Sequence, residues 1–578
     1  MMDFSKIKLG HLVFFTALLL AGFVRFLNLG EAPLNDSEAR LALDAWRVAQ
    51  GVSDVGEFNP APYPGYILVT GLLFGLLEPT NFLARFLPAL AGVSLLLVPI
   101  LLRDRLGMPA ALVLAFGLAL DPGLVAASRL VAGPMPALAF GLLAGIAWQQ
   151  GRPRLAGLLG ALLLLSGPPA MQGIVIVLAT FILLRFLPDP DESTSAQPAI
   201  KQGTSSQQIQ ALGVLVISLL AIGTLFLQIP QGLAALANSF LAYFSGWAGS
   251  SGVPAGRVAA ALLIYQPVAL IFMLLSIART LYRRQVDYLD LLLIFATGIA
   301  LLHGLLYPDR QTLDLVWVLT PMWLLASREL IRQIDQSQQH LAAYGLGLLI
   351  VLLAGLLWFN LAGLSRADPQ LNNATARLLL MAGVVLLAAV TTILVTMGWT
   401  WKNGKFGLVL GSIGAGSLYL ISVLWGSTQV RANLPAELWY SGGAGSQADL
   451  LAKTTHELSV WTTGFPDQVE IVLKGESPSV QWVLRDFSEL KIVDIIPTQD
   501  LPAILITPQT EQPPALTAAY RGQDFNWWVY PGWVNALPEN LPAWITFREA
   551  PLTQKQIILW ARSDLFPGGE LEISNSEN

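Results

Sequence analysis

Apolar residues fill most of this chain in long runs that short polar segments separate. Most runs approach the roughly 20 residues that an α-helix needs to cross the hydrocarbon core of a bilayer, and some are shorter. A further run, 66–78, is short for a crossing and predicts a re-entrant or interfacial segment. We therefore predict a polytopic α-helical membrane protein with about 13 transmembrane helices, at 11–29, 82–102, 109–127, 136–149, 155–166, 171–187, 208–228, 258–280, 288–306, 313–326, 341–361, 376–397 and 406–425.

Basic residues between these runs predict the orientation of the chain. Loops on the cytoplasmic side carry an excess of Lys and Arg, and the basic clusters fall in every second loop, on the side of Lys6 and Lys8. The N-terminus is therefore expected in the cytoplasm of a cell membrane and the C-terminal part outside. This orientation of the later spans holds only if segment 66–78 does not cross the membrane. A full crossing there would invert every later span. The Pro-, Ser- and Gln-rich stretch 188–207 predicts a flexible cytoplasmic loop.

The pattern changes after the last apolar run. Residues 446–463 show the spacing of an amphipathic helix, and 469–473, 503–507 and 557–561 are short β-rich runs with turn residues between them. We expect a transmembrane domain over 1–426 and a small α/β extracytoplasmic domain over 442–570.

Composition sharpens this division. The chain is 54% hydrophobic and 12% charged, with a mean hydropathy of +0.59, whereas soluble domains carry about 25% charged residues. These values exclude a soluble or nucleic-acid-binding protein. Residues 427–578 hold 9 basic and 18 acidic side chains, and this net negative charge favours a solvated outer domain over one docked on anionic headgroups. With no cysteine and four scattered histidines, no thiolate or histidine-built metal site is predicted.

The first outer loop, 30–65, concentrates acidic residues directly after the first predicted span. Leu41, Ala42, Ala45 and Trp46 form a helical stripe after a capping position at Asn35 or Asp36. Such a helix would lie along the membrane surface and hold its carboxylates at the mouth of the bundle. The alternative is a solvated loop in which Asp36 only caps the helix.

Several motifs of the chain occur in a recognisable order. The first loop contains Asp36-Ser37-Glu38-Ala39-Arg40 and a Pro-rich segment from Pro60 to Tyr66, and the motifs Asn81 to Gly92 and Leu120 to Arg129 follow. This order resembles the GT-C superfamily of membrane glycosyltransferases, especially its dolichyl-phosphate-mannose protein mannosyltransferase and aminoarabinose transferase group. Gln481 to Asp486 is similar to the Trp-x-Leu-Arg-Asp element of the flippase-activity-associated, oligosaccharyltransferase-like relatives.

The resemblance implies a membrane glycosyltransferase that moves a sugar from a polyprenyl-phosphate donor to a protein, lipid or glycan acceptor outside the membrane. Its base would be a carboxylate that takes the acceptor proton, and guanidinium groups would bind the departing phosphate. Tyrosines at the membrane edge would bind substrate. The residues assigned to these roles are Asp36 and then Glu38 as the base, Arg129, Arg310 and Arg85 for the phosphate, and Tyr63, Tyr66 and Tyr307 for substrate.

Two other functions stay open. A transporter or flippase for lipid-linked sugars is one, although the chain lacks the internal symmetry typical of transporters. The other is a non-catalytic GT-C partner in glycan assembly, because the family has adjacent Asp-Glu where Ser37 here separates Asp36 from Glu38.

The two carboxylates also make Mg²⁺ or Mn²⁺ a candidate cofactor, although related transferases with monophosphate donors often need none. Arg25 and Arg257 are expected to reach lipid headgroups.

Overall fold

The structure is a computed structural model of the chain. It describes residues 9–51, 60–131, 133–186, 203–249, 252–283, 287–334, 341–367, 373–432, 434–439, 445–496, 501–510, 516, 518–532 and 537–566. Most of the predicted loop 188–207, and Asp54 and Glu57 of the first outer loop, lie outside these residues.

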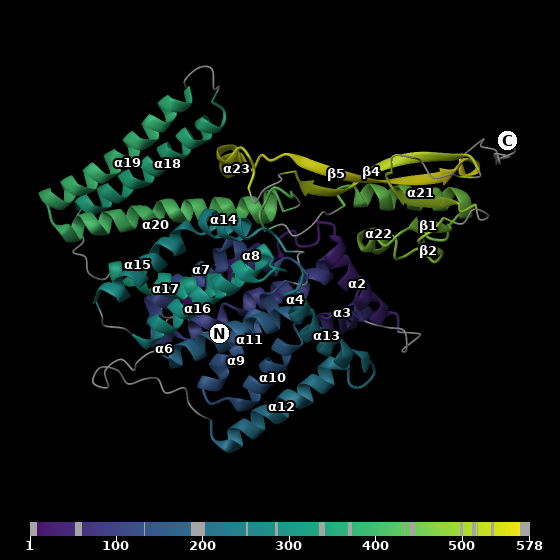
Figure 1. Ribbon diagram of the computed structural model, residues 1–578, viewed down its shortest axis with the longest axis horizontal. Coiled ribbons are helices and arrows are strands. Elements are labelled where there is room, and N and C mark those ends of the chain that lie inside the picture. The colour runs from purple at the N-terminus through teal and green to yellow at the C-terminus, as the bar shows by residue number, and fades with distance from the viewer. Residues whose placement is uncertain are drawn as a thin grey trace, which may run out of the picture.

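Helices make up the first three quarters of the chain (Figure 1). Those of the apolar part are α1 (Leu9–Phe26), α2 (Asp36–Ala49), α3 (Pro64–Leu76), α4 (Asn81–Ser94), α5 (Leu97–Leu101), α6 (Arg103–Leu106), α7 (Met108–Leu120), α8 (Pro122–Ser128), α9 (Met135–Gln149), α10 (Pro153–Leu164), α11 (Pro168–Arg185), α12 (Ser205–Gly223), α13 (Gln231–Ser245), α14 (Ala255–Tyr265), α15 (Pro267–Arg283), α16 (Tyr288–Leu306), the 3₁₀ turn η2 (Thr312–Leu315), α17 (Val316–Ile334), α18 (Leu341–Ser365), α19 (Asn373–Gly398), α20 (Trp401–Trp425) and the π-helical turn η4 (Gly426–Val430).

The predicted apolar runs all fall on helices of the apolar part. Within the described residues, eight helices are long and apolar enough to cross a membrane, or up to ten if each of two bent pairs is one span. Only 6% of the apolar windows of α12 and α19 is buried inside the protein, as expected of helices whose sides face lipid. The chain is thus a multi-span helical membrane protein, and the count of 13 crossings stays a prediction.

Two predicted spans are not continuous. The run 109–127 bends by 55° between α7 and α8, and the run 258–280 bends by 93° between α14 and α15. Pro122 and Pro267 follow these breaks, and proline disfavours helical backbone in the residue before it. The structure also contains α13, which the apolar pattern did not predict, and α3 matches the short segment 66–78.

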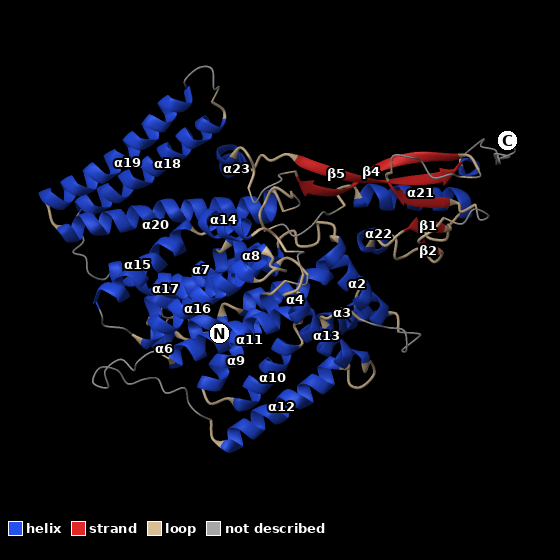
Figure 2. Ribbon diagram, in the orientation of Figure 1, coloured by secondary structure: helices blue, strands red, loops and turns tan. Residues whose placement is uncertain are grey.

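The C-terminal part is built around a mixed sheet with the strand order β2-β1-β3-β5-β4 (Figure 2). The central strands β1 and β3 pair in parallel, and β5 pairs antiparallel with both β3 and β4. Leu451 and Leu458 of α21 pack into the same core as Ile471, Ile504 and Trp527 of the sheet. The elements are α21 (Ala448–Thr463), β1 (Ile471–Lys474), α22 (Pro478–Val483), β2 (Leu490–Val493), β3 (Ile504–Pro508), β4 (Tyr520–Pro531), α23 (Leu541–Phe547), β5 (Leu552–Arg562) and the 3₁₀ turn η5 (Ser563–Leu565). The predicted helix and the three predicted strands are confirmed, and β2 and β4 are additional.

The sheet domain rests on one end of the helical part (Figure 1). The indole Nε1 of Trp482 donates a hydrogen bond to Asn81 Oδ1 (2.8 Å), and Trp544 Nε1 donates to the carbonyl of Ala436 (2.7 Å). Both tryptophans are buried. They therefore anchor the two parts to each other.

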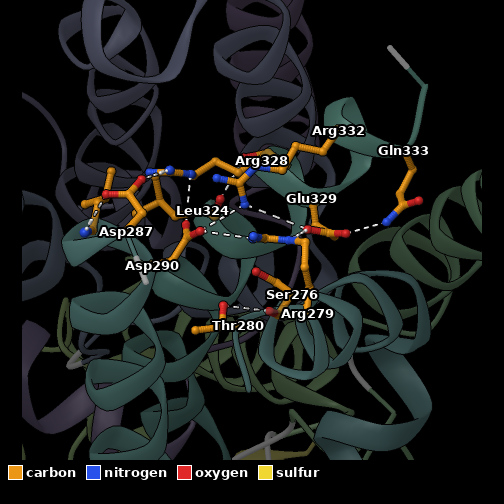
Figure 3. A network of polar contacts seen from close by, with 12 residues as sticks. Ser276, Arg279, Thr280, Asp287, Asp290, Leu324, Arg328, Glu329, Arg332 and Gln333 are labelled. Carbon is orange, nitrogen blue, oxygen red and sulfur yellow. Dashed lines mark hydrogen bonds and ion pairs between the residues drawn. The ribbon is translucent and has the colours of Figure 1, made fainter. Parts of the chain in front are cut away.

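Three arginines from the basic segments that predict the orientation, Arg279, Arg328 and Arg332, also form ion pairs inside the protein. The side chains of Asp290 and Glu329 are 1% and 0% exposed, and both lie against guanidinium groups of α15 and α17 (Figure 3). Asp290 pairs with Arg279, Arg328 and Arg332, and Glu329 pairs with Arg279 and Arg332. Arg279 bridges the two carboxylates, at 3.0 Å to Asp290 and 2.8 Å to Glu329. Removing a partner from such a buried pair leaves an uncompensated charge, so the network holds α15, α16 and α17 together.

Arg25 does not reach lipid headgroups, contrary to the expectation from its place near the end of α1. Its side chain is fully buried, and it donates to the carbonyls of Ala21, Leu118 and Ala119. The carbonyls of Leu118 and Ala119 lie in the last turn of α7, which ends at Leu120 and therefore leaves its last carbonyls without helical partners. A polar group that enters the bundle is stable when backbone acceptors satisfy it.

Candidate functional site

The acidic loop after α1 forms the helix α2, as predicted. Asn35 caps it: the Asn35 side chain accepts from the Glu38 backbone N–H, and the Glu38 carboxylate accepts from the Asn35 N–H. Such a capping box satisfies two backbone donors that the helix start would otherwise leave unpaired. The cap is therefore Asn35, which leaves the Asp36 side chain available for other contacts.

Glu38 is held inside the protein. Its side chain is 2% exposed and lies against Arg85 of α4, whose Nε donates to Oε1 at 2.9 Å and whose Nη2 donates to Oε2 at 2.7 Å. Oε1 also accepts from the Val131 N–H at 3.0 Å. Arg85 in turn donates to the carbonyls of Leu29, Ala32 and Pro33. This pair fastens the segment after α1 to α4 and engages both oxygens of Glu38.

Asp36 makes its contacts with the sheet domain. Its Oδ1 accepts from the backbone N–H of Ser479 (3.0 Å) and from the Ser479 hydroxyl (2.5 Å), and its Oδ2 accepts from Trp528 Nε1 (2.7 Å). The buried Trp527 donates to the same hydroxyl at 2.9 Å. These donors fix the Asp36 carboxylate from residues more than 440 positions away in the chain, and no signal in the sequence links them to it.

A polar groove of about 900 Å³ lies between α2 and the sheet domain. Asp36, Arg40, Asp44 and Arg47 line it from α2, and Glu476 and Gln481 line it from the opposite side. The α2 residues follow the spacing of three or four residues that places side chains on one face of a helix. That spacing is a signal in the sequence that could have placed Arg40, Asp44 and Arg47 on the same face of the helix as Asp36.

Asp44 is the most buried acid of this groove, with 6% of the residue exposed. Its Oδ1 accepts from Arg47 Nη1 at 3.1 Å and its Oδ2 from the Ala61 N–H at 3.0 Å. Burial raises the pKa of Asp44 above the ordinary carboxyl value of 3.8, against the opposing effect of these donors. The groove thus holds a carboxylate that takes up a proton more readily than Asp44 in solution would.

Because the folded protein binds this proton more tightly than the unfolded chain, Asp44 favours folding below pH 3.8 and loses that contribution as the pH rises through its raised pKa. As the pH rises from 3.8 through the raised pKa of Asp44, we expect the melting temperature of Asp44→Asn to rise relative to that of wild type. Melting curves of both proteins in detergent at a series of pH values measure it. A constant difference between the two proteins at every pH would contradict the raised pKa.

An apolar cavity of about 270 Å³ adjoins the groove. Tyr63 lines both, and Tyr66, Leu87, Phe140 and Leu165 line the cavity between α3, α4, α9 and α10. The Tyr66 hydroxyl donates to the carbonyl of Ala84 at 2.9 Å. Two of the predicted substrate residues, Tyr63 and Tyr66, are thus close together where a polar space meets an apolar one.

The predicted phosphate-binding arginines divide between two places. Arg85 and Arg129 line, with Glu38 and Glu437, a separate cavity of about 60 Å³, which has room for a few water molecules. Arg129 Nη1 donates to the carbonyls of Val24, Arg25 and Leu27 at the end of α1. Both guanidiniums thus hold the chain that follows α1.

Arg310 and Tyr307 belong to another cluster. Arg310 Nη1 donates to the carbonyl of Tyr307 at 2.6 Å, and the Tyr307 hydroxyl donates to the carbonyl of Tyr243 at 3.0 Å. Tyr307 stacks on Tyr243 and on His303, whose Nε2 lies 3.1 Å from the Tyr243 hydroxyl. These contacts join α13 to the end of α16.

The described residues contain no group of three or more His, Asp or Glu side chains that could hold a metal ion. Asp36 and Glu38 are each occupied by nitrogen or hydroxyl donors rather than directed at one point. The divalent cation therefore stays a prediction, and we derive no step through one.

Comparison with solved structures identifies the fold. A crystal structure of ArnT from Cupriavidus metallidurans bound to undecaprenyl phosphate matches 96% of this chain and 98% of its own, with a TM-score of 0.54 and 14% identity. The apo structure of the same protein matches 86% and 92%, with a TM-score of 0.50 and 16% identity. No family model and no curated protein sequence matches the chain. The chain therefore has an ArnT-like fold, which agrees with the fold that the resemblance of the sequence motifs implied.

Proposed function

We propose that this protein is a membrane glycosyltransferase that takes a sugar from a polyprenyl-phosphate donor and passes it to an acceptor at the outer face of the membrane. One observation carries the proposal: the charged groove and the apolar cavity meet at Tyr63. A lipid-linked sugar has the same division, with an isoprenoid chain joined to a charged sugar phosphate. The ArnT-like fold, seen in ArnT with undecaprenyl phosphate bound, supports this assignment.

In this proposal the isoprenoid chain next to the phosphate occupies the cavity between α3, α4, α9 and α10. The phosphate and the sugar enter the groove, where Arg40 and Arg47 provide positive charge from α2. Guanidinium groups bind phosphate oxygens through paired hydrogen bonds. These two arginines take the phosphate role because both line the groove with side chains that are 63% and 54% exposed. Arg85 and Arg129 do not line it, and they donate to Glu38 and to backbone carbonyls.

Transfer then requires a base beside the sugar. The acceptor oxygen attacks the anomeric carbon, the bond from that carbon to the phosphate oxygen breaks, and the lipid phosphate leaves with the electron pair. We assign the acceptor proton to Asp36, which lines the groove and is oriented by Ser479 and Trp528. Asp44, whose raised pKa suits proton uptake, is the second candidate.

Radioactive transfer tests the proposal. Purified protein in liposomes is given undecaprenyl-phosphate sugars labelled in the sugar, with a cell-envelope extract as the source of acceptor. We expect label on the acceptor and the release of one undecaprenyl phosphate for each sugar moved. Donor that stays intact with every sugar tried would contradict the proposal.

The structure also favours a second function, a non-catalytic partner in glycan assembly. Two observations support this function. Glu38 is buried in an ion pair with Arg85, and both carboxylate oxygens of Asp36 accept hydrogen bonds from the sheet domain. A protein of this kind would bind the donor without cleaving it. Binding of undecaprenyl-phosphate sugar without release of undecaprenyl phosphate would identify it.

The sheet domain should affect catalysis through Asp36. We expect Ser479→Ala and Trp528→Phe each to lower the transfer rate about tenfold, because each removes a donor that orients the Asp36 carboxylate. Initial rates at saturating donor measure the effect. Trp461→Phe is the matched control, since Trp461 is 58% exposed and contacts Phe566. Wild-type transfer rates in both test variants would show that Ser479 and Trp528 do not position Asp36 for catalysis.

A further inference from the structure

A second groove of about 770 Å³ lies on the other side of the helical part. Its lining residues come from α15, α18 and α20, and from α23 and the residue that follows it in the C-terminal part. Figure 1 shows α23 near the ends of α18 and α20. The side chains along it are mainly apolar and include Ile271, Val351, Trp358 and Leu418. This volume is within the range of about 300–1,000 Å³ that is typical of small-molecule sites.

Arg431 lies at the end of this groove beside α23. It directly follows the apolar helix Trp401–Val430 and therefore lies where that helix would leave the hydrocarbon. Its Nε donates to Glu437 Oε1 at 2.8 Å, but its two Nη atoms have no acceptor among the described residues. The side chain is 26% exposed. The groove thus combines an apolar channel with guanidinium donors at one end that no described residue accepts from.

Among the described residues, the positive charge at this end of the groove exceeds the negative charge in contact with it. Glu437 is 3% exposed and is shared between Arg431 and Arg548, whose Nε lies 3.3 Å from Glu437 Oε2. Arg548 is itself 4% exposed, and its Nη1 donates to the carbonyls of Trp544 and Ile545. Two guanidiniums against one carboxylate leave a single positive charge. That charge is held by Arg431, the more exposed of the two.

We propose that this groove binds an anionic phospholipid. One acyl chain lies between α18 and α20, and the phosphodiester accepts hydrogen bonds from the Nη atoms of Arg431. The single negative charge of a phosphodiester matches the single excess positive charge of the site, and charge-assisted hydrogen bonds to Arg are among the stronger ones in proteins. The site shares no lining residue with the groove at α2, so it does not depend on the glycosyltransferase proposal.

Native mass spectrometry of the purified full chain tests this site, with phosphatidylglycerol and phosphatidylcholine of equal chain length as probes. We expect wild type to retain phosphatidylglycerol, and Arg431→Gln to bind it about tenfold more weakly, as the loss of a charge-assisted hydrogen bond predicts. Arg366→Gln is the matched control. Arg366 is an exposed arginine that pairs with Glu549 and does not line the groove.

A second variant tests the channel rather than the charge. Gly355 lines the groove, and a Cβ at this position would meet no atom within 4 Å. Gly355→Phe should therefore fill the groove while the protein keeps its fold, and we expect it also to bind phosphatidylglycerol about tenfold more weakly. The proposal is overturned if wild type binds both lipids equally. It is also overturned if both variants retain phosphatidylglycerol as wild type does.

Discussion

Asp36→Asn should lower the rate of sugar transfer by about 10²- to 10⁴-fold, which is the usual contribution of a positioned general base. The asparagine keeps an oxygen that can accept from Ser479, so α2 and the sheet domain should stay in contact. It cannot take the acceptor proton. Initial rates at saturating donor measure the effect, and an unchanged melting temperature shows that the loss is chemical.

Glu31→Gln is the matched control for this experiment. Glu31 lies in the same loop, is exposed, and lines neither the groove nor the apolar cavity. It should transfer sugar at the wild-type rate. If Asp36→Asn also keeps the wild-type rate, Asp36 is not the base, and Asp44→Asn becomes the variant to measure.

Glu38→Gln should instead unfold the protein more easily, by about 3–5 kcal/mol, because it leaves Arg85 as an uncompensated buried charge. Both side chains are at most 4% exposed, and they share two hydrogen bonds. The free energy of unfolding can be measured by titration with denaturing detergent. Arg85→Met should cost a similar amount, because the carboxylate is then left without its cation.

The double variant Glu38→Gln/Arg85→Met shows whether Glu38 is half of a structural pair or a catalytic residue. We expect it to be clearly more stable than the sum of the two single losses predicts, since neither charge remains. Its matched control is the exposed pair Lys453 and Glu457, 3.9 Å apart, whose removal should cost under about 1 kcal/mol. A stable Glu38→Gln protein that has lost only transfer would make Glu38 the base.

The sequence predicts the helical elements well because the signals are local. An apolar run of membrane length has few alternatives to a helix, and the Asn35–Glu38 capping box, which starts α2, lies within four residues. Pro122 and Pro267, which follow the breaks in the two bent spans, are also local features of the sequence. We predicted continuous spans there because hydropathy does not distinguish a straight apolar helix from a bent one.

The contacts that define the site are not local. Asp36 meets Ser479 and Trp528 only because the sheet domain folds back on α2. Likewise, Arg85 resembles a phosphate ligand in the sequence, whereas the structure places its donors on Glu38 and on backbone carbonyls. The motif order thus identified the region, but the partner of each charge depended on distant segments.

The groove and the apolar cavity together explain why the site lies at α2. The helix exposes one charged face to the groove, and Tyr63, at the entrance to α3, lines both that groove and the apolar cavity. A lipid-linked sugar is the ligand whose two halves suit both spaces. The account therefore depends on one amphiphile occupying the groove and the cavity at the same time.

Photocrosslinking with a polyprenyl phosphate that carries a diazirine in its first isoprene units tests this most directly. The protein is labelled in liposomes, digested, and the modified peptides are identified by mass spectrometry. The account predicts label on α3, α4, α9 or α10 around Tyr66 and Leu87, and loss of that label when Tyr63 is replaced by Trp to narrow the junction. Label confined to α15, α18 and α20, with none near Tyr63, would contradict it.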